Sequence, residues 1–522
     1  MIPQRSERKG SIALVPLSSE RRESKVGYSA LWCGKGGKTS AFQGLPWWVS
    51  IPFIPFGNRN IQIENLRRYK VRKVLMIVMC LLMVASVSFA AGSTETVQAK
   101  PATLPIRTVE FWHTMSGVNA TAIDKIAEQF NATIGKDQGI VVKSVFQGND
   151  NSEKLKTLAQ AGDTRNFPDV AQIVGAGIPA AMTYSQLVPV QDMYDKGGAF
   201  VAKADLEPNM IRSFTYAGKM IGMPVSCSAI LLYYNKDMFK EVGLANPPST
   251  IAQMADAIKQ LMVVKGKDVE RYGLNVAVRR YQLSNFIGGQ GEFNFFGDNE
   301  GGRAAPMTKV TFGEDGTLRA FLTEWEKVIK TGGYKASEDD INEEFALELF
   351  GMAIMSTARI GKITALVGDN FQWGVAPLPK VNAQDKGGIA VGGSCVVMFD
   401  PEKDPAQVDA SWQFVQYMAS PEVQFQFHKD TGYIPVNKKV YSLPGIDEHF
   451  AKNPAYKVAV DSIHSSHPNN QEPFDIINWE IDTIIKNHML AFAQGKETLQ
   501  QCHDGIVNEC NQKLADYHKA NK

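Results

Sequence analysis

The chain has 522 residues, more than one ordinary domain buries around a single core, so two or more cores are expected. Lysine and arginine number 55 against 54 aspartate and glutamate, which gives a formal net charge of +1. Because no large basic block lies outside the N-terminal region, the charge distribution argues against a nucleic-acid-binding surface.

The N-terminal region is predicted to contain a secretion signal that begins inside the chain. Residues 1–70 are basic and show no sustained hydrophobic period, whereas residues 71–90 have the basic, apolar and small-residue order of a signal peptide. Valine can be encoded by GTG, which bacteria also use as a start codon. We therefore hypothesise that Val71 is the initiator and that residues 1–70 are a mis-assigned, disordered extension. The alternative is a cytoplasmic tail before a retained signal anchor. After cleavage, residues 91–105 are expected to form a flexible leader.

Strands and helices alternate in the next part of the chain. Strands are predicted at 108–112, 140–146 and 170–174, with helices at 120–130 and 152–161 between them. This alternation predicts parallel βαβ units in an α/β fold. Ligands of such sheets bind at the carboxyl ends of the strands, and these ends carry Trp112, His113, Asp150 and Gly175.

Residues 216–239 are expected to carry the chain from one lobe to another. They join a short apolar segment containing Pro224, small polar residues that include Ser228, and a β-rich run at 230–234. Because proline lacks a backbone donor, two strand pieces joined in this way predict a strand that leaves one sheet and enters another. A cleft between two lobes is a usual place for a small ligand, so we place the hinge and part of a binding site here.

The rest of the chain continues the α/β pattern and contains two more segments of the crossing type. Helices are predicted at 249–264, 318–331, 342–350, 405–419, 422–428 and within 474–520, strands at 272–278, 351–357 and 371–379, and a loop at 288–302. The second crossing segment is 389–398 and the third is 431–436. Three such segments can act as one hinge, because each absorbs only a small backbone rotation.

The presumed mature chain holds few cysteines, which argues against a disulfide scaffold. Cys227 and Cys395 lie in two similar crossing segments, where buried thiols are favoured over a bridge. Cys502 and Cys510 are eight residues apart in a helical pattern, too far along the axis to pair within one straight helix.

Four motifs in order resemble a known family. They are residues 111–117 (FWHTMSG), 231–237 (LLYYNKD), 391–394 (VGGS) and 428–435 (HKDTGYIP). Together they are similar to family 1 extracellular solute-binding proteins, the substrate receptors of ATP-binding-cassette (ABC) importers. Within that family the chain most resembles the periplasmic sn-glycerol-3-phosphate-binding branch. The resemblance runs from about Val109 to the C-terminus.

The resemblance implies a fold and a function. The fold is an α/β, two-lobed periplasmic-binding-protein fold with a ligand cleft between the lobes. Lobe 1 is expected to comprise residues 106–226 and 393–435, and lobe 2 residues 227–392 and 436–522. The implied function is capture of a sugar or polyol, with sn-glycerol 3-phosphate among the candidates, by hinge closure and delivery to permease subunits in the membrane. We expect a periplasmic or extracellular monomer that is not an enzyme and needs no cofactor, metal or nucleic acid.

The resemblance also implies ligand contacts. Ser228 matches the family's serine in the first crossing strand, and Gly392 or Gly393 matches the glycine in the second, where a backbone amide can approach the ligand. Tyr433 matches the tyrosine of a Thr-Gly-Tyr motif. Trp112 and the adjacent His113 fit the entry turn, although ordinary core packing of the tryptophan is an equal alternative.

Several positions depart from the glycerol-phosphate branch. Asp150 stands where the branch has a tyrosine, Gly175 where it has an acidic residue, and Asp482 near the place of an arginine that an aspartate cannot replace in holding phosphate. These changes indicate a shifted ligand, with fewer phosphate contacts and more hydroxyl contacts. Asp150 could accept hydrogen bonds from sugar hydroxyls, or simply belong to a turn. Arg280 or its neighbour Arg279 could restore an anion contact, but a solvated surface position is the default for arginine.

Other aromatic and histidine residues have simpler explanations. Trp373 and Trp479 are possible stacking platforms, although packing in the core or at an interface is favoured for both. His464 and His467 lie in serine-rich sequence without a carboxylate or thiolate at metal-ligand spacing, so no metal site is expected.

The competing function is a secreted glycoside hydrolase that uses paired carboxylates. Asp150 and Asp169 are the candidate pair, because such enzymes need two carboxyl groups on either side of the glycosidic bond. Neither lies in a recognisable catalytic motif, and the chain has no Gly-x-Ser-x-Gly or His-Glu-x-x-His pattern. A ligand sensor for chemotaxis is a third role, which a binding protein can also serve.

Overall fold

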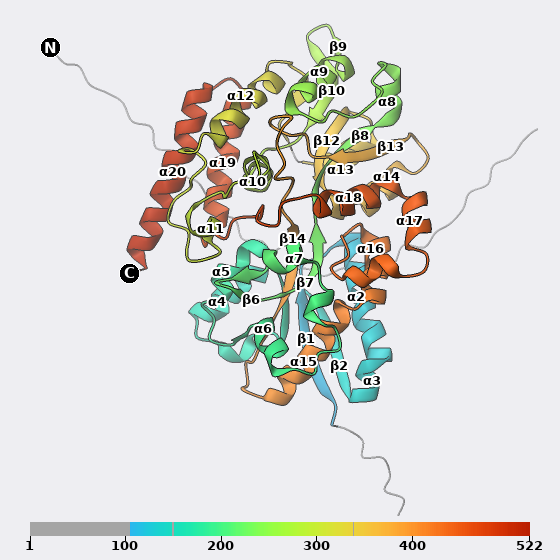
Figure 1. Cartoon of the computed structure of the whole chain (residues 1–522), viewed down its shortest axis with the longest axis vertical. Helices are drawn as coiled ribbons and strands as arrows, with labels where there is room; N and C mark the ends of the chain where they lie inside the picture. Colours follow the sequence, from blue (N-terminus) through green and yellow to red (C-terminus); the bar gives the residue numbers. More distant parts are fainter. Residues whose placement is uncertain (1–104, 149–150, 338, 522) are drawn as a thin grey trace, which may run out of the picture. The chain divides into compact units, whose positions relative to one another are not determined.

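The computed structural model describes residues 105–148, 151–337 and 339–521, and these belong to one compact unit of the chain, residues 99–522. The expected translation start at Val71, the signal peptide and nearly all of the leader lie outside the described residues, as does Asp150. Two six-stranded sheets organise this unit, and Figure 1 shows them one above the other, with β7 and β14 of the first sheet near the middle of the view.

The first sheet has the strand order β2-β1-β3-β14-β4, with β7 also paired to β14. Its strands are β1 (Arg107–His113), β2 (Ile140–Phe146), β3 (Val170–Val174), β4 (Leu187–Val188), β7 (Met223–Ser228) and β14 (Gly392–Phe399). β1 runs parallel to β2 and β3, as the alternation of strand and helix predicts, whereas β14 is antiparallel to its three neighbours.

Helices cover the first sheet through apolar side chains at helical spacing. They include α2 (Gly117–Ala132), α3 (Ile134–Gln138), α4 (Asn151–Gln160), α15 (Pro405–Met418) and α16 (Pro421–Thr431). In α2 the buried side chains recur every three or four residues, ending at Phe130. Phe414 of α15 packs edge-on against Phe130 and against Phe111 of β1, each at a ring-centroid distance of 5.4 Å. This aromatic cluster joins the two helices to the sheet.

The second sheet has the strand order β11-β10-β12-β8-β13, with β9 paired to β10. Its strands are β8 (Ile230–Asn235), β9 (Val263–Lys265), β10 (Asp268–Asn275), β11 (Tyr334–Lys335), β12 (Phe350–Ser356) and β13 (Trp373–Pro377). Helices of this part are α8 (Lys236–Glu241), α9 (Ile251–Leu261), α10 (Arg280–Gly288), α12 (Thr317–Ile329), α13 (Ile341–Ala346), α14 (Ile360–Val367), α18 (Pro454–His464), α19 (Asn478–Ala493) and α20 (Leu499–Ala520).

The short elements connect these layers. They are α5 (Ile178–Ala181), α6 (Val190–Lys196), α7 (Pro208–Ser213), α11 (Asp298–Gly302), α17 (Ile446–Lys452) and the β5–β6 hairpin strands (Thr215–Tyr216 and Lys219–Met220). No described helix is both long and apolar enough to cross a membrane.

The first crossing strand is confirmed. β7 ends in the first sheet at Ser228, and β8 begins in the second sheet at Ile230, so that only Ala229 separates the two pairings. Ala229 is itself held by Thr357: its N–H donates to the threonine hydroxyl (3.1 Å), and its carbonyl accepts from the threonine N–H (2.8 Å). The backbone therefore stays bonded where it changes sheets.

The other two crossing segments differ from the prediction in detail. The strand in the second begins at Gly392, while the preceding Ala390 donates its N–H to the Asn285 side chain (2.8 Å). The third, residues 431–436, forms no regular strand, and its ladder contact is a single bridge between Ile434 and Cys227. The first sheet takes its strands from residues 107–228 and 392–399, and the second from 230–377; the exact lobe boundaries stay predictions.

Several predicted elements have other limits in the structure: the helix expected at 342–350 ends at Ala346, and the strand expected at 272–278 is Asp268–Asn275. The helix expected at 249–264 ends at Leu261, because residues 263–265 pair with β10 as β9. The loop expected at 288–302 contains α11, whose Asn299 to Gly301 have left-handed backbone angles. The tail is mostly helical as predicted, as α19 and α20, and Thr498 caps α20 by accepting a hydrogen bond from the Gln501 N–H. The four cysteines of the described chain are free and buried, which confirms the favoured reading of Cys227 and Cys395.

Candidate ligand-binding site

A cavity of about 570 Å³ lies where the chain passes between the two sheets. Its size is within the usual range for small-molecule sites. One side is formed by residues after β1 and β3, and the other by α10, the end of β12 and the start of α19. Its lining residues are Thr114, Met115, Ser116, Asn119, Gln172, Val174, Ala176, Ser228, Arg279, Arg280, Tyr281, Gln282, Ser356, Ala358, Gly393, Ser394, Tyr433, Glu472, Asn478, Trp479 and Asp482.

Four of the predicted contact residues come together at this cavity. They are Ser228, Arg280, Gly393 and Tyr433, contributed by β7, α10, β14 and the third crossing segment. Trp112, His113, Gly175 and Gly392 are not among the lining residues, and Asp150 lies outside the described residues. Side chains more than 200 residues apart in sequence thus share one cavity.

Trp112 and His113 face the interior beside the cavity. The Trp112 indole N–H donates to the Glu110 carboxylate (2.6 Å), and the Lys154 ammonium lies 4.0 Å from the centre of its ring. His113 is 1% exposed, and burial lowers its pKa despite the nearby Asp124 carboxylate. Because β1 is covered on both faces, its own side chains do not reach the cavity. The polar residues that line the cavity in this part of the chain follow the strand, at residues 114–119.

The two glycines at the start of β14 allow close approach of backbone and side chains. Gly393 has φ +94°, and a Cβ there would lie 2.1 Å from the Ser226 carbonyl oxygen of the paired strand. Only glycine fits this combination of backbone angle and contact. At Gly392 a Cβ would lie 2.6 Å from the Tyr281 hydroxyl, so this glycine leaves room for the tyrosine at the cavity wall. Gly175, at the end of β3, lies near Phe214 and Phe474.

A buried glutamine that the sequence analysis missed lies at the base of the cavity. Gln172, in the middle of β3, is 3% exposed; its side-chain N–H donates to the Ser226 hydroxyl (3.1 Å), and its carbonyl accepts from the Thr114 N–H (3.0 Å). These bonds fix the turn after β1 against β7. The signal in the sequence is a polar residue inside an otherwise apolar buried strand, which requires partners.

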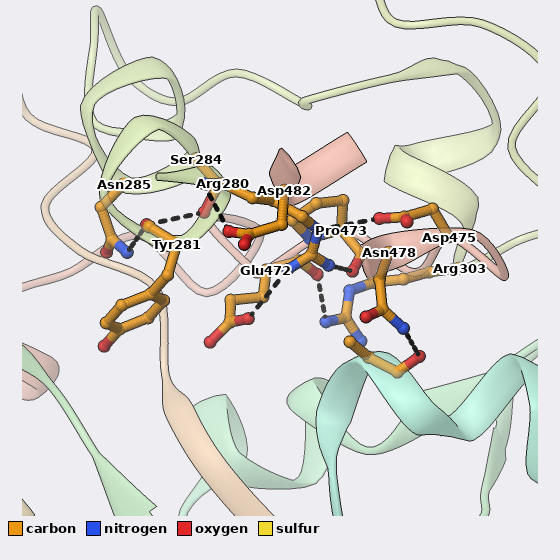
Figure 2. A network of polar contacts seen from close by, with 11 residues as sticks. Arg280, Tyr281, Ser284, Asn285, Arg303, Glu472, Pro473, Asp475, Asn478 and Asp482 are labelled. Carbon is orange, nitrogen blue, oxygen red and sulfur yellow. Dashed lines mark hydrogen bonds and ion pairs between the residues drawn. The ribbon is translucent and has the colours of Figure 1, made fainter. Parts of the chain in front are cut away.

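Arg280 is the centre of a buried ionic network, shown in Figure 2. Its Nε lies 3.0 Å from an Asp475 carboxylate oxygen, its Nη1 3.5 Å from Glu472, and its Nη2 donates to the Pro473 carbonyl (2.7 Å). The residue is 6% exposed, so the solvated surface position considered from sequence is wrong. Burial raises the pKa of the Asp475 and Glu472 carboxyls, while the Arg280 guanidinium opposes this shift.

Arg303 fastens the same segment to the first-sheet side. Its guanidinium donates to the carbonyls of Arg212 (3.0 Å) and Ser213 (2.9 Å) in α7, and to the Glu472 carbonyl (2.6 Å). The group also lies 3.8 Å from the centre of the Phe474 ring. Residues 472–475 are therefore held between α10 and α7, and Glu472 is presented at the cavity from a well-bonded backbone.

Asp482 of α19 holds the start of α10. One of its carboxylate oxygens accepts from the Arg279 Nε (2.9 Å) and Nη2, and the other accepts from the Arg280 N–H (3.1 Å).

The two tryptophans considered as stacking platforms lie in different places. Trp479, one turn before Asp482 in α19, is 50% exposed and lines the cavity, so it is not packed in the core. Trp373 instead stacks on Tyr233 at 5.9 Å and is absent from the lining.

The remaining candidates lie away from this cavity. Asp169 accepts a hydrogen bond from the Glu110 N–H (2.7 Å) and does not line it. His464 contacts Glu207 (3.0 Å), and His467 stacks on Phe293 at 4.2 Å. Within the described ranges, no group of three or more histidine, cysteine, aspartate or glutamate residues could hold a metal ion.

Comparison with known proteins gives a consistent result. Residues 125–458 match the family described as bacterial extracellular solute-binding protein. The chain is 27% identical over 433 residues to the sn-glycerol-3-phosphate-binding periplasmic protein UgpB of Salmonella typhimurium, which covers 80% of this chain and 95% of the relative. UgpB of an Escherichia coli O1:K1 strain is also 27% identical, over 429 residues. These matches confirm the resemblance inferred from the four sequence motifs.

Solved structures share the fold. UgpB of Mycobacterium tuberculosis, in complex with glycerophosphocholine, superimposes with a TM-score of 0.65 at 20% identity, covering 79% of this chain and 99% of that one. The sugar-binding protein MalE of Xanthomonas citri gives a TM-score of 0.64 at 20% identity, covering 80% and 99%. The predicted two-lobed α/β fold is thereby confirmed.

Proposed function

This chain belongs to the family of bacterial extracellular solute-binding proteins and is a substrate-binding receptor of an ABC importer; we propose that it captures a sugar or polyol in the cavity described above. Hinge closure then encloses the ligand, and the closed receptor delivers it to the permease subunits in the membrane. We propose export through the segment 71–90 and action as a monomer in the periplasm or at the cell exterior.

The observation that carries this proposal is the composition of the cavity wall. Hydroxyl groups of Thr114, Ser116, Ser228 and Ser356 and amides of Asn119 and Gln172 come from both sheets, and the half-exposed indole of Trp479 lies among them. Many short polar groups with one aromatic face suit a ligand that has several hydroxyls and an apolar ring face. Because polar groups line the cavity on both sides, a bound ligand makes more hydrogen bonds when the lobes are closed, and its binding favours the closed state.

Predicted contact residues on the crossing segments support a hinge mechanism. Ser228, Gly393 and Tyr433 lie at the cavity on three separate crossing segments. A ligand that touches these segments and both lobes interacts more with the closed than with the open arrangement, as population shift requires. Because relatives of this chain are named for binding sn-glycerol 3-phosphate, that compound is included among the ligands to be tested.

Ligand screening on residues 91–522 tests this proposal. We expect at least one sugar, polyol or glycerol phosphate to raise the melting temperature, because a ligand of the folded state stabilises by mass action. Isothermal titration should give one site per chain, and small-angle scattering should show compaction on binding. A melting temperature that no member of a broad panel changes would contradict receptor function, and turnover of a glycoside would instead favour the hydrolase.

A second experiment tests the proposed export. Expression in a bacterium with secretion competence should give a mature protein that starts at Ala91, as measured by mass spectrometry of its N-terminal peptide. Peptides from residues 10–60 in the secreted protein would show that the upstream sequence is translated and retained, contrary to the proposed start at Val71.

A further inference from the structure

On the basis of the proposed function, we infer that the cavity selects uncharged polyols against their phosphomonoesters, and that Asp482 is the residue that sets this preference. Two arginines lie at the cavity, which taken alone would suggest an anion site. Each is instead paired with a carboxylate from the segment 472–482, so that neither supplies net positive charge to a ligand.

Arg279 is neutralised by Asp482 at the cavity wall. Its Nε and Nη2 both donate to one oxygen of the Asp482 carboxylate, with the Nε contact at 2.9 Å. The other oxygen accepts the N–H of Arg280 at 3.1 Å, which fixes the carboxylate against the start of α10. The two side chains are only 27% and 13% exposed. A phosphate that binds the Nε and Nη2 edge of this arginine must displace a carboxylate that already makes charge-assisted hydrogen bonds.

Arg280 is occupied by acceptors from residues 472–475. Asp475, whose side chain is fully buried, and the Pro473 carbonyl accept from it, and the Glu472 carboxylate lies 3.5 Å from its Nη1. In Figure 2 the Glu472 carboxylate and the Tyr281 ring extend from this network toward the same side. Arg280 is therefore a positioning residue that holds Glu472 at the cavity.

The charges along the described part of the cavity wall cancel. Arg279 and Arg280 face Glu472 and Asp482, and Asp475 adds a negative charge behind them. Arg359 lines a smaller neighbouring cavity of about 110 Å³, where it donates to the Asn342 side chain (2.9 Å). Desolvating a phosphate dianion without an available cation is costly.

Uncharged hydroxyl groups suit the same wall. The Glu472 carboxylate lines the cavity and accepts hydrogen bonds without donating any in its ionised form, so it is a partner for ligand O–H donors. Hydrogen bonds to a charged acceptor are stronger than those between neutral groups. Each ligand hydroxyl therefore strengthens binding at this site and each phosphate weakens it, so the site discriminates between ligands by their charge.

Matched pairs of ligands test this inference. Glycerol with sn-glycerol 3-phosphate, and glucose with glucose 6-phosphate, are titrated by calorimetry and thermal shift into wild type, Asp482→Asn and the control Glu241→Gln. Glu241 forms an ion pair with Arg271 (3.0 Å) that is not at the cavity, and its carboxylate is more exposed than that of Asp482. Larger sugars found in the ligand screen are added with their phosphomonoesters.

In wild type we expect the uncharged member of a binding pair to bind at least tenfold more tightly than its phosphomonoester. Asp482→Asn should raise affinity for the phosphomonoester at least tenfold by removing a negative charge from the cavity wall, and Glu241→Gln should not. A wild type that prefers the phosphomonoester overturns the inference but leaves receptor function intact, and this result does not depend on the folding of any variant. An Asp482→Asn protein that melts normally without gaining phosphomonoester affinity overturns the role of Asp482. If neither member of any pair binds, the proposed function fails together with the inference.

Discussion

The buried pair formed by Arg280 and Asp475 gives a sharp stability prediction. Arg280→Met removes the cation but keeps an unbranched apolar side chain of similar reach. Asp475, whose side chain is fully buried, then keeps a carboxylate with no charged partner. Removing one partner of a buried ion pair typically costs about 3–5 kcal/mol. We expect Arg280→Met to lower the free energy of unfolding by about that amount, a large share of the about 5–15 kcal/mol of a typical protein.

The double variant Arg280→Met with Asp475→Leu distinguishes the effect of an unpaired buried charge from the effect of changing the side chains. Replacing both charged side chains by apolar ones of similar volume is often neutral, so the double variant should be more stable than Arg280→Met alone. Urea unfolding of the ligand-free protein, followed by circular dichroism, measures all three proteins. A loss below about 1 kcal/mol in Arg280→Met, or additive losses in the double variant, would refute the reasoning.

The same variant should show a pH dependence of defined sign. Burial already raises the pKa of Asp475, and Arg280 is the group that opposes this. Without Arg280 the folded-state pKa lies further above the unfolded value, so the folded protein binds the proton more tightly. The stability deficit of Arg280→Met relative to wild type should therefore be smallest at acidic pH and grow as the pH rises through the folded-state pKa of Asp475. A deficit relative to wild type that is constant with pH would contradict this assignment.

Three other predictions address the hinge and the cavity. Gly393→Ala should cost about 2 kcal/mol or more in urea unfolding, because φ is +94° and the Cβ meets the Ser226 carbonyl; unchanged stability would contradict the strain. The hydrogen bond to Glu207 raises the pKa of His464, so its stabilising effect is full below pH 6.5 and is lost as pH rises through the higher folded value; His464→Gln should flatten that decline. Trp479→Ala should weaken ligand binding about tenfold, equal to about 1.4 kcal/mol, with Trp479→Phe restoring most of it in calorimetry; equal affinity in both would remove the ring from the site.

Much of the fold follows from local sequence pattern. The first three strands and the passage from β7 to β8 lie at or within a residue or two of their predicted limits, because apolar runs bounded by glycine, proline and small polar residues are strong local signals. The third crossing segment was predicted from the same kind of residues, but its backbone pairs only through Ile434. Whether a short segment forms a ladder depends on the partner strand, which local pattern does not specify.

The candidate site could be predicted only in part, since burial decides which side chains reach the cavity. Ser228 and Gly393 were found because they lie where strands change sheets. Trp112 looked equally suitable at the end of β1, but its indole packs between Glu110 and Lys154 instead. The ionic partners of Arg280 lie about 195 residues further along the chain, and no spacing rule links positions so far apart.

Fastening residues 472–475 from two sides has a consequence for closure. Arg303 ties the segment to α7, and Arg280 ties it to α10, so a rotation that keeps both contacts must pass close to this segment. We therefore expect closure to displace Glu472 less than groups further from the crossing segments. The buried charges explain this rigidity, because breaking either contact exposes an unpaired ion to an apolar interior. Ligand discrimination by charge can thus occur at first contact, before the lobes close.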